Sequence, residues 1–103
     1  MIKVSVMYPN TPDARFDFDY YRLKHMPLVK ARLGDACRSC SIDKGLAGEN
    51  PGTPAPYVAI GHVIGDSIEA LEAAYAPHAD EIMGDIANFT NIAPVVQINE
   101  VLL

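Results

Sequence analysis

The stretch Phe16-Asp17-Phe18-Asp19-Tyr20-Tyr21-Arg22-Leu23-Lys24-His25-Met26-Pro27-Leu28 is expected to form the first helix, and it carries an unusual histidine. On a helical wheel, His25 lies at the middle of an apolar face made of Phe18, Tyr21, Leu28 and Val29. An imidazole in that position points at the core, where it needs a polar partner or borders a cavity. Pro27 has no backbone N–H and is expected to bend the helix beside His25.

The sequence around this helix predicts five further elements. Residues 2–8 alternate between apolar and other side chains and form a strand. Asp17 is the expected N-cap of the first helix, which runs to about Leu33, where Gly34 can stop it. Further strands are expected at 36–44, 57–64 and 95–101. A second helix starts with a capping box at 66–69, with Asp66 as its cap, runs to about Tyr75, and restarts at Pro77 to end near 84–86.

This order of elements, β-α-β-β-α-β, predicts an α+β, ferredoxin-like fold with both helices on one face of a four-stranded antiparallel sheet. The strand at 57–64 is apolar on both of its faces, and the first and last strands are only partly polar on the second face. A monomer would leave that second face in water. We therefore expect a homodimer whose two sheets pack face to face.

Composition narrows the class of protein. The 103 residues carry a formal net charge of −5 and are 50% hydrophobic, which argues against a disordered chain and suits one domain. No apolar run reaches the roughly 18 residues of a membrane span. The N-terminus begins with a strand pattern where a secretory leader would have a basic and then an apolar segment. We therefore expect a single cytoplasmic domain at 1–103 without a membrane partner.

The charges are divided unevenly along the chain. All eight Lys and Arg residues lie between Lys3 and Lys44, whereas residues 45–103 have acidic side chains and no Lys or Arg. Nucleic-acid binders show a basic stripe and an excess of positive charge, so nucleic acid is not an expected partner. We expect the basic residues to face the acidic half, within the fold or across subunits.

The two cysteines, Cys37 and Cys40, have the C-x-x-C spacing of redox and metal sites. Redox pairs of this kind lie at a helix N-terminus, whereas this segment reads as a strand. On a strand the odd spacing sends the two side chains to opposite faces, where they cannot form a disulfide or share an ion. We therefore expect no metal site here.

The segment at 45–56 holds three glycines and three prolines and is long for a connection between neighbouring strands. Loops of this length are often lids over a site. A flexible hairpin tip is an equally good interpretation of the same composition.

Two stretches resemble the EthD-like family. They are the first-helix pattern Phe18-x-x-Tyr21-x-x-x-His25-Met26-Pro27-Leu28 and the stretch from Ala76 to Asn91. The resemblance covers nearly the whole chain and implies the dimeric α+β barrel built from ferredoxin-like subunits. The family is named for a protein linked to ethyl tert-butyl ether degradation, which accompanies a cytochrome P450 system. The wider superfamily includes isomerases, polyketide cyclases, cofactor-free monooxygenases and haem enzymes, so the fold alone does not identify a reaction.

A candidate site follows from these placements. His25 and Tyr21 share one side of the first helix and are the expected catalytic pair, with His25 as general acid/base. The side chains expected to contact a ligand are His62, Tyr8, Phe18, Ile60 and Phe89, with His62 and Ile60 assigned to the sheet face that meets the helices. A core histidine bonded to a backbone carbonyl or a tyrosine is the competing interpretation of His25.

The function expected from these residues is a cofactor-independent enzyme acting on a small, apolar, oxygenated compound, by isomerase, cyclase or monooxygenase-type chemistry. No phosphate loop, nucleophile elbow or metal-binding histidine repeat is present, so no cofactor is expected. Haem stays an open alternative, because one histidine suffices as its axial ligand. A non-catalytic protein that binds small molecules in an oxidative degradation pathway is the other alternative.

Overall fold

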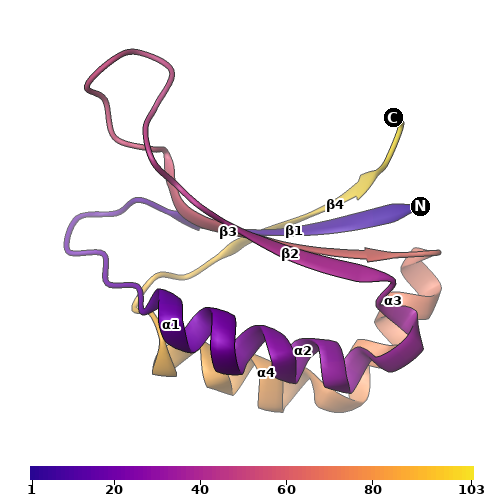
Figure 1. Ribbon diagram of the computed structural model, residues 1–103. Helices are drawn as coiled ribbons and strands as arrows, with labels where there is room; N and C mark the ends of the chain where they lie inside the picture. Colours follow the sequence, from indigo (N-terminus) through magenta and orange to yellow (C-terminus); the bar gives the residue numbers. More distant parts are fainter.

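The computed structural model describes residues 1–103 and shows two helical segments on one face of a four-stranded antiparallel sheet (Figure 1). The first half contains β1 (Ile2–Pro9), α1 (Phe18–Tyr20), a π-helical turn η1 (Tyr21–His25), α2 (Met26–Leu33) and a 3-10 turn η2 (Gly34–Ala36). The second half contains β2 (Ser39–Lys44), β3 (Tyr57–Gly65), α3 (Ile68–Tyr75), η3 (Ala76–His78), α4 (Ala79–Asp85), η4 (Ile86–Asn88) and β4 (Val95–Glu100). The ferredoxin-like order predicted from the sequence is confirmed. None of the helices has the length and apolarity that crossing a membrane requires.

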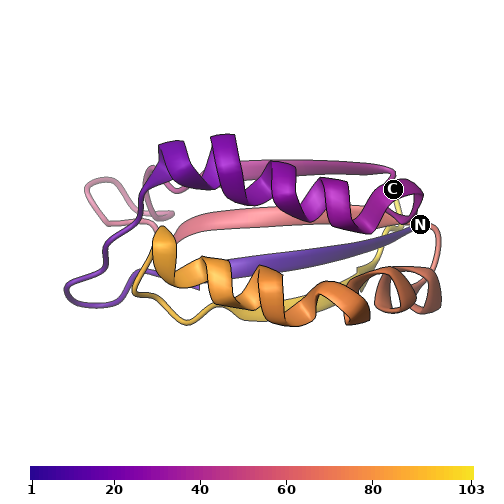
Figure 2. The same cartoon turned by 90° about the horizontal axis from the view of Figure 1, so that it is seen from below.

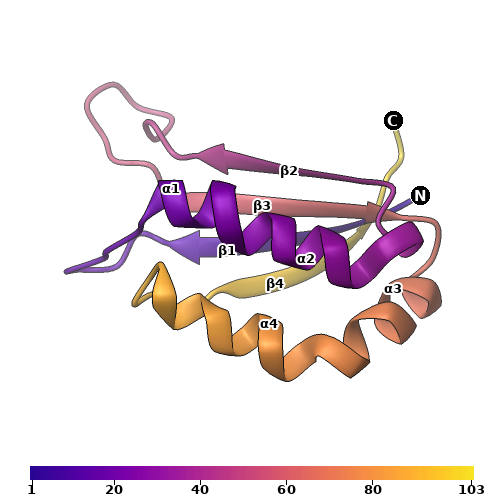
Figure 3. The same cartoon turned by 60° about the horizontal axis from the view of Figure 1, so that its bottom comes forward.

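The sheet has the strand order β2-β3-β1-β4, so β1 lies inside the sheet between β3 and β4. The helices cover one face only, with α1 and α2 over the half that holds β2 and β3 and with α4 along the β4 edge (Figures 2 and 3). We call the uncovered face the open face. Because side chains alternate along a strand, the register of β1 fixes which residues look toward the helices.

That register places His62 and Ile60 on the open face, so their assignment to the helix side was wrong. Ser5 is paired with His62 across β1 and β3, while its neighbour Val4, which lines the space under the helices, is paired with Val63. The strand β3 is apolar at both sets of alternate positions. Period-two alternation therefore shows that two faces exist without showing which of them is covered.

The first helix begins and ends where the sequence predicts. The Asp17 carboxylate accepts a hydrogen bond from the Tyr20 backbone N–H at 3.1 Å, and Gly34 ends the helix with a φ of 56°. Between them, the turn η1 has the wider π-helical spacing, in which the Met26 N–H reaches the Tyr21 carbonyl. This turn precedes Pro27, whose missing N–H cannot continue the ladder. The irregularity expected from the proline is thus a π turn that holds Tyr21 and His25, and such turns are frequent at functional sites.

The second helix is broken at Pro77 as predicted, but its N-cap differs. Ser67, rather than Asp66, caps α3, because its hydroxyl accepts a hydrogen bond from the Ala70 N–H at 3.1 Å. Asp66 instead accepts a 2.6 Å hydrogen bond from Arg38. The carboxylate of Asp66 is thus paired with Arg38, which lies 28 positions away in the sequence. Local spacing does not reveal such a contact.

The strand β2 begins at Ser39, three residues later than predicted, and this changes the environment of the cysteines. Cys37 lies before the strand, so the alternation that was expected to separate it from Cys40 does not apply. Both cysteines pack beneath the helices as free thiols, and burial, followed by the nearby Cys40 thiol, raises the pKa of Cys37. The expectation that they lie on opposite faces was wrong.

The loop at 45–56 projects from one end of the sheet on the side away from the helices (Figure 1). It is held locally by hydrogen bonds such as Gly48 N–H to the Thr53 carbonyl at 3.0 Å. It therefore does not cover the layer between sheet and helices, where the site was expected.

Two exposed ion pairs join the basic and the acidic halves within the fold. Arg32 on α2 donates two hydrogen bonds to Glu81 on α4, at 2.7 and 3.1 Å. The second pair is the Arg38–Asp66 contact. Exposed pairs of this kind contribute little stability on their own. The Arg32–Glu81 pair does connect the two helices along the side of the molecule that holds His25.

Candidate functional site

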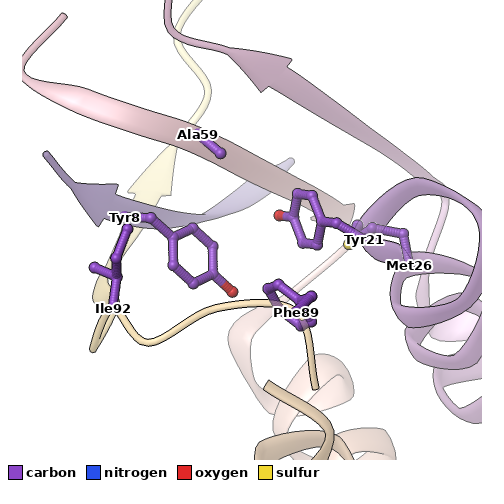
Figure 4. Packing of buried hydrophobic residues seen from close by; sticks show 6 residues of the cluster. All are labelled: Tyr8, Tyr21, Met26, Ala59, Phe89 and Ile92. Carbon is purple, nitrogen blue, oxygen red and sulfur yellow. The ribbon is translucent and has the colours of Figure 1, made fainter. Parts of the chain in front are cut away.

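A cluster of buried, largely aromatic residues lies between the first helix, the strands β1 and β3, and the segment that follows η4 (Figure 4). The Tyr8 and Phe89 rings are 5.9 Å apart and nearly perpendicular, and the Tyr21 and Phe89 centroids are 5.0 Å apart. Gly61 makes this packing possible, since a Cβ on it would collide with the Tyr21 hydroxyl. Met26, Ala59 and Ile92 complete the cluster.

The hydroxyls of Tyr8 and Tyr21 make no hydrogen bond within the protein, although only 1% and 2% of these residues is exposed. No buried side-chain nitrogen or oxygen is left without a partner, so both hydroxyls must reach accessible space. Burial raises the pKa of both tyrosines above the usual value, and each hydroxyl therefore stays neutral and able to donate.

His25 is held by a carboxylate from the other helical segment. Its Nδ1 lies 2.9 Å from Oδ2 of Asp85, the last residue of α4. The second oxygen of Asp85 accepts hydrogen bonds from the Tyr20 hydroxyl at 2.6 Å and from the Asn88 amide at 3.0 Å. Burial by itself would raise the pKa of Asp85, but the hydrogen bonds from Tyr20, Asn88 and His25 outweigh it and lower that pKa. Asp85 is therefore a carboxylate, which can only accept, and Nδ1 of His25 carries the proton.

The other nitrogen of His25, Nε2, has no partner within the protein. Only 4% of His25 is exposed, and its ring lies between Phe89, at a centroid distance of 4.6 Å, and Tyr21, at 5.8 Å. Since no buried nitrogen is left unpaired, Nε2 reaches the cavity that His25 lines. The ring is thus oriented by one nitrogen and free to react at the other.

The cavity has a volume of about 540 Å3 and lies between the helices and the sheet. Of its 22 lining residues, 18 are hydrophobic, and they come from β1, β3, β4 and both helical segments. Met83 on α4 and Val96 and Ile98 on β4 line the cavity and are about half exposed to solvent. An apolar space with a few polar groups is the usual composition of a small-molecule site.

The structure brings together four of the seven residues expected at the site. His25, Tyr21 and Tyr8 line the cavity, and Phe89 packs on the His25 ring. Phe18 lies outside the cavity and packs on Phe16, at a centroid distance of 4.6 Å. The remaining two, Ile60 and His62, are on the open face, separated from His25 by the sheet.

His62 belongs to a polar network that crosses all four strands on the open face. Its Nδ1 lies 3.1 Å from the Ser5 hydroxyl and its Nε2 lies 3.0 Å from the Asp43 carboxylate. Asn99 donates to Ser5 at 3.1 Å, and Gln97 donates to Asn99 at 2.7 Å. Both nitrogens of His62 are therefore engaged, in contrast to those of His25.

Asp85 is the residue of the candidate site that sequence reasoning missed. It lies on one helical face with Ile82, Ile86 and Phe89, at the spacing i, i+3, i+4 and i+7. A carboxylate on an apolar helical face is the same signal that singled out His25. Pairing the two signals would have required knowing that the helices lie side by side. No three His, Cys, Asp or Glu side chains come together where they could hold a metal ion.

Comparisons with known proteins agree with this fold. A family model described as the EthD domain matches residues 10–93. The crystal structure of an EthD-like protein from Ralstonia eutropha JMP134 is 56% identical in sequence and superposes with a TM-score of 0.96, covering 99% of this chain and 92% of that chain.

Two more distant structures share the fold alone. An ethyl tert-butyl ether (EthD) family protein from Bacillus halodurans C-125 has 18% identity and a TM-score of 0.75, with 99% of both chains covered. HapK from Hahella chejuensis has 14% identity and a TM-score of 0.60, with 99% of this chain and 93% of that chain covered. No curated protein sequence matches the chain.

Proposed function

Because this chain belongs to the EthD family, whose domain model spans residues 10–93, we propose that it is a cofactor-independent enzyme of catabolism. Its substrate is a small, largely apolar, oxygenated compound, and His25 is the general acid/base. The reaction is of the type in which a proton leaves carbon or oxygen next to an electron-withdrawing group. Isomerisation, cyclisation and oxygenation without a cofactor all start in this way.

The single observation that carries the proposal is the environment of His25. The carboxylate of Asp85 holds Nδ1–H at 2.9 Å, Nε2 has no partner in the protein, and the residue lines an apolar cavity of about 540 Å3. A carboxylate in this position fixes the tautomer and stabilises the imidazolium that forms when Nε2 takes a proton. A histidine with a merely structural role would have its second nitrogen paired, as His62 does.

Two phenol groups complete the proposed chemistry. When Nε2 removes a proton, negative charge develops on a substrate oxygen. The hydroxyls of Tyr8 and Tyr21 reach accessible space, are neutral and have no partner in the protein, so they are available to donate to that oxygen. Donors fixed in a mostly apolar space stabilise such charge better than water does, because they need no reorientation.

A base in an apolar cavity can be tested without the natural substrate by using 5-nitrobenzisoxazole as the probe. Loss of its C3 proton to a base breaks its N–O bond and releases a coloured cyanophenolate. We expect the wild-type protein to accelerate this step and the His25→Gln variant to be slower by on the order of 100-fold. A His78→Gln variant is the matched control, because His78 lies in η3 and does not line the cavity.

The outcomes separate the proposal from its alternative. Equal rates for the wild type and the His25→Gln variant would remove His25 from the role of base. If neither protein accelerates the probe although both bind it, the protein is a non-catalytic binder of small molecules, and the enzyme proposal fails.

We also propose that the protein acts as a homodimer in the cytoplasm. The open face carries the half-buried Met7, Ile60 and Ile64 and the exposed Val95, an apolar surface that a second copy would cover. Two free thiols suit a reducing compartment. Sedimentation at micromolar concentration is expected to give twice the mass of the 11.2 kDa chain, and a stable monomer would contradict the dimer.

A further inference from the structure

The cavity beside His25 is long, and it follows the whole of β1. Its lining includes Ile2, Val4, Val6 and Tyr8, which are alternate residues on one face of that strand. Six residues of β-strand span roughly 20 Å. On the helical side the lining runs from Tyr21 to Leu33, and the twelve steps between these residues span roughly 18 Å of helix. A volume of about 540 Å3 spread over this length leaves a narrow space.

Three polar side chains of the candidate site lie together at one end of this space. The Tyr21 ring packs edge-on against Tyr8 and stacks on His25, and each of the three residues has an unpaired hydroxyl or nitrogen. The side chains that line the rest of the interior are aliphatic, among them Val4, Val29, Leu33, Val63, Leu71 and Ile82. Glu72 and Tyr75 lie on α3, near the far end. The cavity is therefore polar at this head end, apolar along most of its length, and bordered by Glu72 and Tyr75 at its far end.

The charge of the lining bears on the head group that it accepts. No Lys or Arg lines the cavity, and Glu72 is its only carboxylate. Asp85, directly behind His25, adds a negative charge close to the head end. An anionic head would lose its hydration without gaining a cationic partner, which is costly in an apolar site. A ketone, phenol or other neutral oxygenated head avoids that cost.

We propose that the ligand of this site is a neutral amphiphile with an unbranched alkyl tail. Its oxygen lies among His25, Tyr8 and Tyr21, and its tail extends along β1 toward Ile2. The proposal deepens the function given above and rests on it for the chemistry at the head, whereas the tail groove stands on the cavity itself. A compact molecule would leave most of the apolar length unfilled.

Binding of 2-alkanones, from 2-butanone to 2-undecanone, tests the groove by NMR titration of the whole protein. We expect affinity to rise about fourfold for each added CH2 until the chain reaches the end of the groove. Nonanoate, with its charged head, is expected to bind more weakly than 2-nonanone. A series whose affinity does not change with chain length would overturn the proposal, and so would tighter binding of nonanoate.

A substitution on β4 locates the tail. Val96 lies on the cavity side at the level of Val6, two residues or roughly 7 Å from Tyr8. The Val96→Trp variant is expected to bind 2-butanone as the wild type does and to lose at least tenfold in affinity for 2-undecanone. Leu23→Trp is the matched control, because Leu23 is 62% exposed and lies outside the cavity. Equal loss for both ketones in Val96→Trp would contradict a tail along β1.

These measurements follow binding alone, so their failure can be told apart from failure of the enzyme proposal. If affinity rises with the chain length of the ketone but His25→Gln does not slow proton abstraction, the tail groove is supported and His25 is not the base. If affinity does not change with chain length but the reaction depends on His25, His25 is supported as the base and the alkyl tail is contradicted.

Discussion

Two histidines in this protein each contact an aspartate, and only one of them has a nitrogen left for chemistry. His62 is bonded at both ring nitrogens, to Ser5 and to Asp43. His25 is bonded at Nδ1 only, and its Nε2 reaches an apolar cavity. The sequence marks both residues as histidines among apolar neighbours. What separates them is the number of satisfied nitrogens, a property that depends on long-range contacts.

The hydroxyl of Tyr21 provides a prediction at this scale. It has no partner in the protein, so the Tyr21→Phe variant is expected to change the free energy of unfolding by no more than about 0.5 kcal/mol. The same variant is expected to lose about tenfold in affinity for 2-nonanone, because one donor to the carbonyl is gone. Urea unfolding and NMR titration give the two values. Unchanged affinity would show that the hydroxyl does not meet the ligand.

Asp85 provides a prediction about pH. Its pKa is lowered in the folded protein, so its charge stabilises the fold above the unfolded value of about 3.9, and this contribution is lost as pH falls through the lower folded value. The Asp85→Asn variant is expected to lose roughly 1–3 kcal/mol at pH 7. The difference from the wild type should then narrow below about pH 3.9. Urea unfolding from pH 7 to pH 3 measures this difference in unfolding free energy. A difference that does not change with pH would contradict the stabilising role of the Asp85 charge.

At the scale of elements, features set by neighbouring residues were predicted correctly, whereas features set by packing between distant segments were not. The Asp17 cap, the stop at Gly34 and the break at Pro77 depend on residues within one turn, and all three are confirmed. The choice of Ser67 over Asp66 as the cap depends on a distant partner, because Asp66 is paired with Arg38. The sequence also does not show which face of β3 the helices cover, because both of its faces are apolar.

The close approach of Gly61 and Tyr21 provides a prediction for β3. The Gly61→Ala variant must displace the Tyr21 side chain, whose ring is packed in the aromatic cluster, so we expect a loss of roughly 1–3 kcal/mol in unfolding free energy. Gly84→Ala is the control, because a Cβ at Gly84 in α4 meets nothing within 4 Å. That change should be neutral or stabilising. Thermal unfolding compares the two variants, and equal stability would contradict the close contact between Gly61 and Tyr21.

At the scale of the whole molecule, the fold and the position of His25 between the helices and the sheet were predictable from the sequence, but the contact between His25 and Asp85 was not. The resemblance at 18–28 and 76–91 gave the family, which the domain match at 10–93 and the 56% identical protein from Ralstonia eutropha confirm. His25 and Asp85 are 60 positions apart and meet only because the two helical segments lie side by side on the sheet (Figure 2). Periodicity locates each side chain on a face without saying which faces meet.

The central claim is that Asp85 acts through His25, and a double-mutant cycle tests it most directly. Rates of proton abstraction from 5-nitrobenzisoxazole are measured for the wild type, His25→Gln, Asp85→Asn and the double variant. We expect each single variant to be slower by on the order of 100-fold, and the double variant to be no slower than His25→Gln. Glu81→Gln, on the same helix but outside the cavity, should keep the wild-type rate. Losses that multiply in the double variant would show two independent contributions and contradict the account.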